Sequence, residues 1–365
     1  MDNIITYAEQ TLESFALRPF CDVDSLILSC VAYLDIPQEL SAAHSWKGLP
    51  LRELFRAEHF DRLFSVTFAP ERTKKLLTAL AASPRFRDVR VMGYVDHTDQ
   101  VLEKQFSAMT FRLADRLSFI AFRGTDSTVV GWKEDFNMAF RSPIPSQEEA
   151  IRYLTVAGRH CPGTILLGGH SKGGNLAVYA AAFCKESLQL RIGKVFSHDG
   201  PGFLPHVLQS PGFSRISSRV EKTLPQSSVV GMLLEHQETA KIIKSRTVSL
   251  LQHDPFTWVV ENGAFLPLEQ LTVDARHVDR TLSAWLLKKS PEERERIVDA
   301  LFGILETTDI QSFTQLRTDW QKTLPAVARQ VRHLDADTRE LLFRALGELA
   351  LVSVKALPDT IKKES

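Results

Sequence analysis

The chain has 365 residues, 44% of them hydrophobic and 24% charged, which is the composition of an ordinary globular protein with one large domain or two. Its 44 basic and 44 acidic residues balance to a net charge of zero. This balance gives no compositional support to the electrostatic binding of nucleic acid, so nucleic-acid-binding proteins are disfavoured as a class.

The cysteines and the N-terminus indicate the compartment that we expect. The four cysteines follow neither a zinc-ligand spacing nor a disulfide framework, which favours a reducing environment. The sequence shows no basic leader followed by an apolar run, and no stretch reaches the roughly 18 apolar residues of a membrane span. We therefore expect a cytoplasmic protein without an integral membrane span.

The N-terminal part, residues 1–85, is predicted to be mostly helical. Residues 22–34 (DVDSLILSCVAYL) begin with acidic capping residues and continue as an apolar run. Pro70 opens another helix at the first turn, where its missing N–H costs nothing.

Residues 89–275 alternate short apolar runs with helical patterns. Buried parallel strands are apolar almost throughout, so this alternation predicts an α/β fold with a mainly parallel central sheet and helices on both faces. The predicted strands are 89–94, 117–122, 164–167 and 194–197, and the predicted helices are 148–161 and 175–185.

From residue 276 onward the pattern is helical again. Ser290, Pro291 and Glu293 form a strong helix start, with an N-cap serine, proline at the first position and glutamate at the third. We interpret residues 276–365 as a C-terminal helical extension, which is also a candidate surface for a homo-oligomer. Residues 1–275 then form the main domain.

The segment Gly169-His170-Ser171-Lys172-Gly173 lies between a predicted strand and a helix rich in alanine. A GxSxG sequence in this context is typical of a nucleophile elbow, in which a strained turn lifts the serine hydroxyl above the sheet edge. The following helix directs its N-terminal N–H groups at a developing oxyanion. The alternative is an ordinary strand-to-helix turn whose glycines serve packing. We favour Ser171 as a catalytic nucleophile.

A second segment, Phe122-Arg123-Gly124-Thr125, also closes an apolar strand. An elbow serine needs a second oxyanion donor from the loop after an earlier strand. Gly124 would let the backbone turn toward the site, so that the oxyanion hole is formed by the backbone N–H groups of Thr125 and Lys172. The alternative is a plain turn with Arg123 in a structural salt bridge.

These motifs together resemble the class 3, or fungal-type, lipases. The resemblance rests on FRGT, on the following Trp132 and Asp135 in GWKEDF, and on GHSKGG. The chain is more closely similar to an uncharacterised bacterial branch of the α/β-hydrolase superfamily that combines DSLILSCVAYL, FRGTDST, GHSKGGNLAVYAA, SHDGPGF and QHDPFTW. The similarity extends over residues 20–300.

The resemblance implies an α/β-hydrolase fold for residues 1–275, with Ser171 as nucleophile and Thr125 at the oxyanion hole. It also implies that residues 127–140 correspond in position to the lid of class 3 lipases. Residues 203–237 carry several apolar side chains and are a second candidate lid, with core packing as the alternative. The resemblance implies no particular substrate.

The general base is expected among the histidines after the serine, because α/β-hydrolases keep the chain order serine, acid, histidine. We favour His253, which lies in a polar loop (LQHDP) after a β-like stretch at 245–250 and within a motif of the resemblance. His277 is the second choice, and His170, beside the serine, is interpreted as packing. The later histidines are His198, His206, His236, His253, His277 and His333.

The acid is predicted to be Asp199, which follows the strand 194–197 and therefore lies at the edge of the sheet that carries the elbow. It would hold the tautomer of the histidine. The alternative is that Asp199 caps its Asp-Gly-Pro-Gly turn. In class 3 lipases the acid lies after the following strand, and the matching stretch here, 223–228, has no carboxylate. Asp254 and a dyad without an acid remain alternatives.

The sequence therefore predicts a serine hydrolase that cleaves a carboxylic ester, esterase-like or lipase-like, through an acyl-enzyme on Ser171. This chemistry requires neither a metal nor an organic cofactor, and its partner is a small-molecule ester or lipid substrate. Two alternatives stay open. One is a non-catalytic hydrolase-like scaffold, and the other is an acyltransferase or thioesterase on the same fold.

Overall fold

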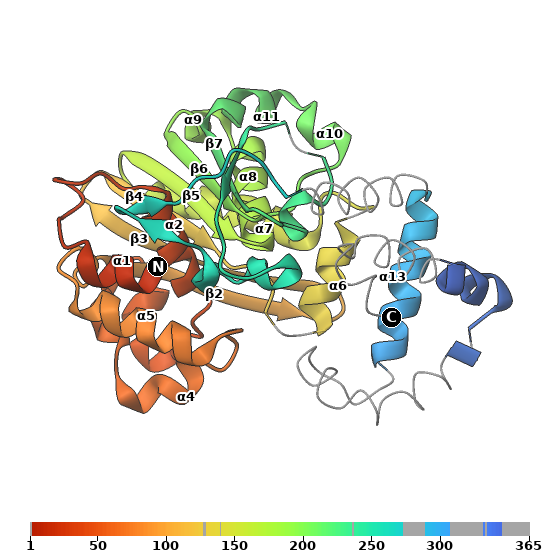
Figure 1. The fold of residues 1–365 in the computed structure, drawn as a ribbon, viewed down its shortest axis with the longest axis horizontal. Coiled ribbons are helices and arrows are strands. Elements are labelled where there is room, and N and C mark those ends of the chain that lie inside the picture. The colour runs from red at the N-terminus through yellow and green to blue at the C-terminus, as the bar shows by residue number, and fades with distance from the viewer. Residues whose placement is uncertain are drawn as a thin grey trace, which may run out of the picture.

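The computed structural model describes residues 2–126, 129–138, 140–235, 237–272, 289–306, 331–332 and 334–344. Its centre is an eight-stranded sheet in which the strands lie in chain order, from β1 to β8 (Figure 1). The strands are β1 (Leu49–Pro50), β2 (Arg90–Asp99), β3 (Lys104–Ala114), β4 (Leu117–Phe122), β5 (Thr164–His170), β6 (Ile192–His198), β7 (Val220–Pro225) and β8 (Ala240–Ile243), with a separate pair, β9 (Val260–Glu261) and β10 (Ala264–Phe265).

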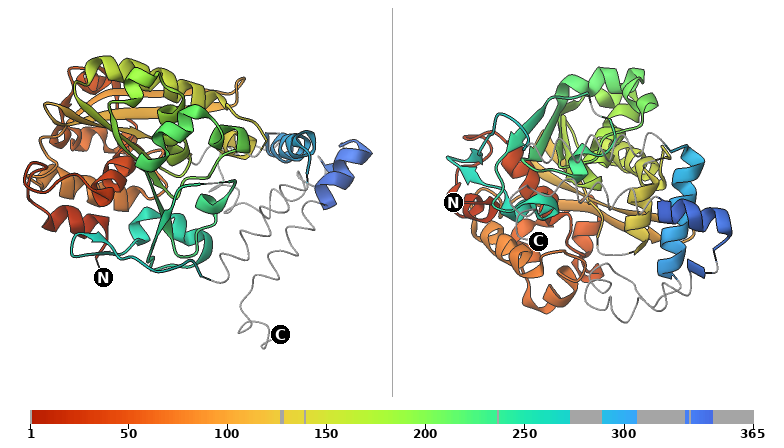
Figure 2. Two further views of the ribbon diagram at one scale, coloured as in Figure 1. Left: turned by 90° about the horizontal axis from the view of Figure 1, so that it is seen from above. Right: turned by 45° about the vertical axis from the view of Figure 1, so that its right-hand side comes forward.

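Helices connect most of these strands and cover both faces of the sheet (Figures 1 and 2). The helices are α1 (Ile4–Gln10), α2 (Asp22–Val31), α3 (Ser41–His44), α4 (Phe60–Leu63), α5 (Pro70–Ala82), α6 (Val129–Asn137), α7 (Pro145–His160), α8 (Lys172–Phe183), α9 (Glu186–Gln189), α10 (Pro205–Leu208), α11 (Pro211–Ile216) and α13 (Pro291–Glu306). The prediction of a mostly helical segment before residue 85, including helices from Asp22 and from Pro70, is confirmed.

The sheet changes direction at β4. Strands β4 to β8 are parallel, and β1 to β4 pair antiparallel. This arrangement confirms the expected mainly parallel α/β-hydrolase sheet and adds the β2–β3 hairpin, which the sequence did not predict. Strand β3 carries buried polar residues, among them Gln105, Ser107 and Thr110, so it lacks the apolar run typical of a buried parallel strand.

Each face of the sheet has its own hydrophobic core, as the alternation along β4 illustrates. Phe119 and Ala121 pack into a core with α1, α2 and α5, whereas Ile120 and Phe122 pack into a second core with α7 and α8. The N-terminal helices therefore form one of the two layers that cover the sheet. They are part of the core of the main domain, in agreement with their place within residues 1–275.

Residues 203–225, the first part of the second candidate lid, belong to the core and the sheet, which corrects that part of the prediction. Val220–Pro225 is strand β7 of the central sheet, and Phe203, Val207 and Phe213 are buried in the core around α8. Core packing, the alternative explanation for these apolar side chains, is what the structure shows. After β7, Ser228 and Gly231 contact Asp199.

The predicted helix start at Ser290 is confirmed by α13, and residues 336–344 are helical as well. Ile297 and Ala300 of α13 pack with Leu341 and Leu342 in a small cluster apart from the two main cores. Helix α13 lies beside α6, where the rings of Phe302 and Phe136 are 5.6 Å apart (Figure 1). The remaining predicted helical residues of the extension lie outside the described residues.

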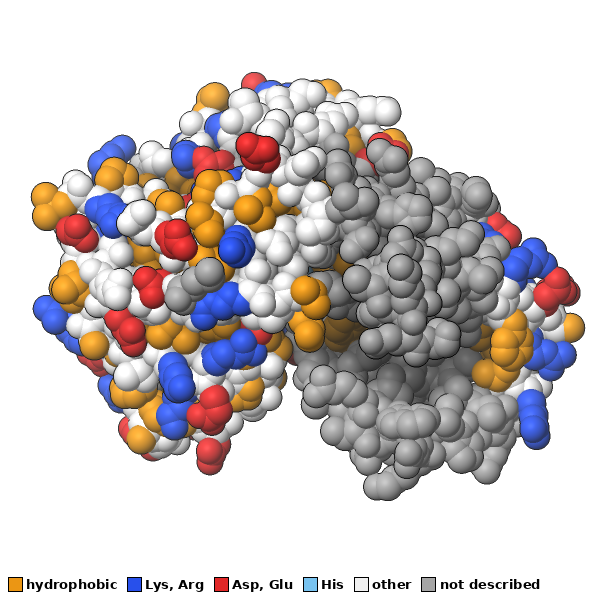
Figure 3. Space-filling view, viewed as in Figure 1, with side chains coloured by type: hydrophobic (Ala, Val, Ile, Leu, Met, Phe, Trp, Pro, Cys, Tyr) orange, Lys and Arg blue, Asp and Glu red, His pale blue; other side chains and the backbone are white. Residues whose placement is uncertain are grey.

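The surface agrees with the balanced composition. Over the described part of the face in Figure 3, acidic and basic side chains are interspersed, and neither sign forms a large patch. None of the helices in the described residues is long and apolar enough to cross a lipid bilayer.

Candidate active site

Ser171 lies at the sharp turn between β5 and α8. Its backbone has φ +59° and ψ −134°, a strained conformation for a residue with a side chain. Its N–H donates to the carbonyl of His198 on β6 at 2.9 Å. At Gly173 a Cβ atom would lie 2.1 Å from the Phe122 carbonyl oxygen, so only glycine lets α8 pack this closely against the end of β4. The predicted elbow geometry is therefore present.

The loop after β4 lies directly against this elbow. Because β4 and β5 are parallel neighbours, their carboxyl ends meet at one edge of the sheet. A Cβ atom at Gly124 would lie 3.1 Å from Cβ of Ser171 and 2.6 Å from the carbonyl oxygen of His170. Within the described residues, no hydrogen-bond partner occupies the backbone N–H of Thr125 or of Lys172. Both groups are candidate oxyanion donors, and α8 begins at Lys172 with its positive dipole end.

The side chain of Thr125 is already engaged. Its hydroxyl donates to Oδ2 of Asp135 on α6, so only its backbone N–H remains for an oxyanion. Burial raises the pKa of the Asp135 carboxyl to about 6, although the Lys172 ammonium and the Thr125 hydroxyl oppose the shift. Asp135 therefore orients Thr125.

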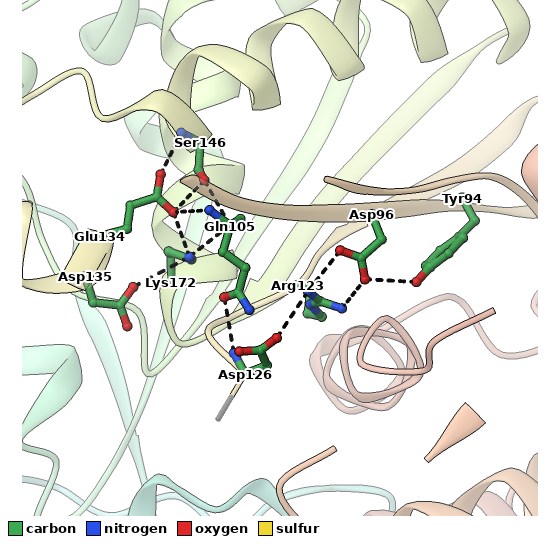
Figure 4. Close-up of polar contacts among 9 residues, drawn as sticks. All are labelled: Tyr94, Asp96, Gln105, Arg123, Asp126, Glu134, Asp135, Ser146 and Lys172. Atoms are coloured by element: carbon green, nitrogen blue, oxygen red, sulfur yellow. Dashed lines mark hydrogen bonds and ion pairs between the residues drawn. The ribbon is translucent and has the colours of Figure 1, made fainter. Parts of the chain in front are cut away.

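Lys172 and Glu134 form a fully buried ion pair behind the elbow (Figure 4). The Lys172 ammonium donates to Oε2 of Glu134 at 3.0 Å and to the carbonyl oxygen of Gln105 at 3.0 Å. Asp135 lies 3.8 Å from the same ammonium. The sequence prediction did not include Glu134. The lysine within the small-residue elbow was the available signal, because a buried ammonium requires a carboxylate partner.

Arg123 makes the structural salt bridge that was the alternative interpretation of its segment. Its guanidinium contacts Asp96 of β2 at 2.6 Å and Asp126 at 3.7 Å, and its side chain is only 1% exposed (Figure 4). The salt bridge of the alternative interpretation is therefore present, and the adjacent Gly124 lies against the elbow, while the oxyanion role of Thr125 stays a prediction.

His253 and Asp199 are brought together from positions 54 residues apart in the chain, with Nδ1 of His253 2.7 Å from Oδ2 of Asp199. Asp199 is buried and has a φ of +50°, at the turn after β6. Its other oxygen, Oδ1, accepts hydrogen bonds from the Ser228 hydroxyl at 2.5 Å and the Gly231 N–H at 3.2 Å. A carboxylate only accepts, so Nδ1 of His253 carries the proton and Nε2 has a free lone pair.

Ser228 explains the departure from the class 3 lipase pattern. The turn after β7, where those lipases carry their acid, has a serine here that donates to Asp199 from the neighbouring strand end. The sequence prediction identified this segment but gave Ser228 no role, because a serine hydroxyl by itself carries no signal for the carboxylate it will contact.

The loop of His253 is a 3₁₀ turn, Ser249–His253, and not the end of a β-like stretch, so the strand prediction at 245–250 was wrong. The buried Gln252 holds the turn by accepting from the Ser227 N–H at 2.8 Å. Asp254 caps the Phe256 N–H and pairs with Arg72 of α5 at 2.5 Å, so it is not available to the imidazole. Contacts of this kind are non-local, and the local sequence pattern could not indicate them.

His170 supports the same loop. Its Nε2 lies 2.8 Å from the carbonyl oxygen of His253, and its Nδ1 lies 3.3 Å from the hydroxyl of Tyr33. Burial lowers the pKa of His170 well below its usual value, so the ring is neutral. A carbonyl oxygen only accepts, so Nε2 carries the proton and Tyr33 donates to Nδ1. We expected His170 only to pack beside the serine. The structure shows that it also positions the backbone of His253.

Of the other histidines after Ser171, the two that the structure describes, His198 and His206, make no hydrogen bond to Asp199. His198 is buried in the sheet, where desolvation lowers its pKa to about 4, and it contacts the Ser25 hydroxyl at 3.0 Å. His206 is exposed on α10. His236, His277 and His333 lie outside the described residues.

The Ser171 hydroxyl has no hydrogen-bond partner in the described part of the chain, Nε2 of His253 included. Free enzymes often show such loose catalytic contacts, which tighten when the substrate binds. The two rings of His170 and His253 are 4.5 Å apart, so the imidazole of His253 lies beside the elbow residue that precedes Ser171.

A mainly parallel sheet with a strained serine elbow between β5 and α8 defines a protein of the α/β-hydrolase class. The chain order Ser171, Asp199, His253 is the order usual for that class. The chain belongs to the Mbeg1-like family, a lipase-like family whose sequence model matches residues 80–303.

Several solved structures are similar to this chain at low identity. One is the Rhizomucor miehei lipase in complex with its propeptide, with 15% identity, a TM-score of 0.37 and coverage of 69% of this chain and 76% of that one. Another is a fungal lipase in an inhibitor complex, with 14% identity, a TM-score of 0.40 and coverage of 68% and 91%. No curated protein sequence matches the chain significantly.

Proposed function

We propose that the protein is a serine hydrolase that cleaves carboxylic esters through an acyl-enzyme on Ser171. The observation that carries this proposal is the hydrogen bond between His253 and Asp199 beside the strained elbow. A histidine with its Nδ1 proton held by a buried carboxylate is suited to act as a general base through Nε2. The hydrogen bond also supports catalysis over the scaffold alternative, which was motivated by the uncertain acid.

In the first half of the reaction, Nε2 of His253 takes the hydroxyl proton of Ser171, and Oγ attacks the ester carbonyl carbon. The carbonyl oxygen becomes an oxyanion, which the backbone N–H groups of Thr125 and Lys172 stabilise. The carbon–oxygen bond to the alcohol then breaks, and the imidazolium of His253 returns its proton to the leaving oxygen.

In the second half, His253 removes a proton from water, whose oxygen attacks the acyl carbon. The bond from that carbon to Oγ of Ser171 then breaks, and the imidazolium returns the proton to Oγ, which releases the acid and restores the serine. Asp199 stabilises the imidazolium in both halves. Losing one oxyanion donor typically costs about 100- to 1,000-fold in turnover, so the position of the Thr125 loop should also affect the rate.

The test is a panel of p-nitrophenyl esters graded by acyl length, with a thioester of the same acyl chain, combined with labelling by a fluorophosphonate probe. Ser171→Ala should abolish both hydrolysis and labelling. Ser214→Ala, the same change at an exposed serine of α11, should leave both unchanged. Full ester activity in Ser171→Ala would refute the assignment.

The panel also separates the alternatives. Faster cleavage of the thioester than of the matching ester would indicate a thioesterase, and product formation with an added alcohol would indicate acyl transfer. If the folded wild type neither labels nor hydrolyses any member of the panel, the protein is a non-catalytic scaffold.

A further inference from the structure

Helix α6 lies within residues 127–140, for which the resemblance implies a lid, but the side chain of Glu134 anchors this helix to the sheet. The side chain of Glu134 is fully buried. Its carboxylate accepts from the Gln105 N–H at 3.0 Å, the Ser146 N–H at 2.9 Å and the Ser146 hydroxyl at 2.7 Å (Figure 4). Helix α6 is thereby joined to β3 and to the start of α7.

The fourth donor to Glu134 is the ammonium of Lys172, the residue directly after the nucleophile. A buried ion pair of this kind is costly to separate, because either partner left alone is an uncompensated charge in a medium of low dielectric constant. Lifting α6 from the sheet would require that separation. The ion pair therefore opposes any lid-like opening of α6.

The neighbouring Asp135 extends the connection to the second oxyanion donor. One of its oxygens accepts from the Thr125 hydroxyl, and the other lies 3.8 Å from the Lys172 ammonium. The two residues whose backbone N–H groups would bind the oxyanion are thus both tied through their side chains to consecutive carboxylates of α6.

We propose that Lys172 and Glu134 are positioning residues whose buried ion pair keeps α6 fixed against the elbow, so that the oxyanion hole is complete before substrate binds. This inference rests on the proposed ester hydrolysis. It adds whether the ester is cleaved in solution or at a lipid–water interface. The enzyme acts on dissolved single ester molecules and does not need a lipid–water interface to open it.

The experiment measures initial rates on p-nitrophenyl butyrate from below to above its solubility limit. For the wild type, the initial rate plotted against ester concentration should follow one hyperbola, with no increase at the concentration where undissolved ester droplets appear. Glu134→Gln and Lys172→Met should each lower kcat about 10- to 100-fold, because displaced oxyanion donors are costly, while KM changes less. Each single variant should also acquire a rise in rate at the solubility limit, because α6 is released.

The double variant Glu134→Gln/Lys172→Met tests whether the two residues act as a pair. Its loss in kcat should be no larger than that of the worse single variant, because neither charge remains unpaired. Lys104→Met is the matched control. Lys104 is mostly buried, and its ammonium pairs with Glu149 of α7 at 3.2 Å and not with Glu134 or Asp135, so its loss should leave kcat and the rate profile unchanged.

A break in the wild-type profile at the solubility limit would overturn the proposal, as would single variants with wild-type kcat or losses that multiply in the double variant. If the variants fail to fold by circular dichroism, the wild-type profile still decides. Fluorophosphonate labelling separates the two levels. If the wild type is not labelled by the probe, the proposed function is refuted. If it is labelled but its rate increases at the solubility limit, only the proposal that α6 stays fixed is refuted.

Discussion

The nucleophile side and the base side of the candidate site are built differently. On the nucleophile side, Ser171 and Lys172 belong to one strand–turn–helix unit, and Thr125 follows the adjacent strand. On the base side, His253 lies on a 3₁₀ turn whose contacts, Asp199 and His170, are 54 and 83 residues away in the chain.

This difference separates two kinds of sensitivity. The nucleophile side depends on close backbone packing and on buried charges, so added volume should displace it, and a changed charge should alter the stability of the fold. The base side depends on single hydrogen bonds that hold a half-buried loop residue, so the loss of one acceptor or donor should damage it. The following substitutions test this comparison in order of decreasing effect.

The largest effect is expected on the base side, from Asp199→Asn. Oδ1 of residue 199 would still accept from Ser228 and Gly231, so the new amide group would face His253. Nδ1 would then have to accept, which moves the proton to Nε2 and removes the base. We expect kcat to fall by about 10,000-fold in steady-state ester assays.

Asp254→Asn is the control, because that carboxylate contacts Arg72 and the Phe256 N–H and not the imidazole. It should retain most of the activity. Equal losses in the two variants would contradict the assignment of Asp199 as the residue that sets the tautomer.

The second effect is on the nucleophile side, from Gly124→Ala. The new methyl group would lie 2.6 Å from the backbone oxygen of His170 and 2.1 Å from the Tyr33 hydroxyl, so the loop that carries Thr125 must move. A displaced oxyanion donor predicts a loss of about 100-fold in kcat.

Gly158→Ala in α7 is the matched change, because there the methyl group meets only the flexible Leu188 side chain, at 2.8 Å. Its kcat should be unchanged. If Gly124→Ala were as active as this control, the Thr125 loop would not belong to the oxyanion hole.

The third effect concerns stability and its dependence on pH. Because the pKa of Asp135 is raised from 3.8 to about 6 in the folded state, its contribution to stability is full below pH 3.8 and is lost as the pH rises through 6. The asparagine of Asp135→Asn stays neutral at every pH. The free energy of unfolding of the variant, relative to that of the wild type, should therefore increase by up to about 3 kcal/mol between pH 4 and 8.

Urea denaturation at each pH measures this difference, with the exposed Asp115→Asn as the control. The control should keep a constant difference from the wild type. A constant difference for Asp135→Asn as well would contradict the buried-charge description of the nucleophile side.

The smallest effect is on the base side again, from His170→Leu. The variant loses the N–H that binds the His253 carbonyl oxygen, and the loop gains freedom at that point. We expect kcat to fall roughly 10-fold with little change in KM. Tyr33→Phe removes only the hydroxyl that contacts Nδ1 of His170 and should lose less. A larger loss of kcat in Tyr33→Phe than in His170→Leu would contradict the proposal that His170 positions the backbone of His253.

The sequence by itself determined the features that depend on residues close together in the chain. The elbow at Ser171, the strand before the FRGT loop, the helix from Pro70 and the helix start at Ser290 were all predicted from runs of fewer than about 15 residues, over which capping and hydrophobic periodicity act. The parallel strands β4, β5 and β6 followed from their apolar runs, whereas β3 was missed because its buried residues include polar ones, and β7 and β8 were not predicted either.

The tertiary structure decided everything that depends on distant partners. It selected Asp199 over Asp254 as the contact of His253, turned the stretch before His253 into a 3₁₀ turn and included residues 220–225 in the sheet. It also buried Lys172 against Glu134, which is 38 residues away. Hydrogen bonds and ion pairs between such segments form only when the chain has folded, so no local pattern in the sequence records them.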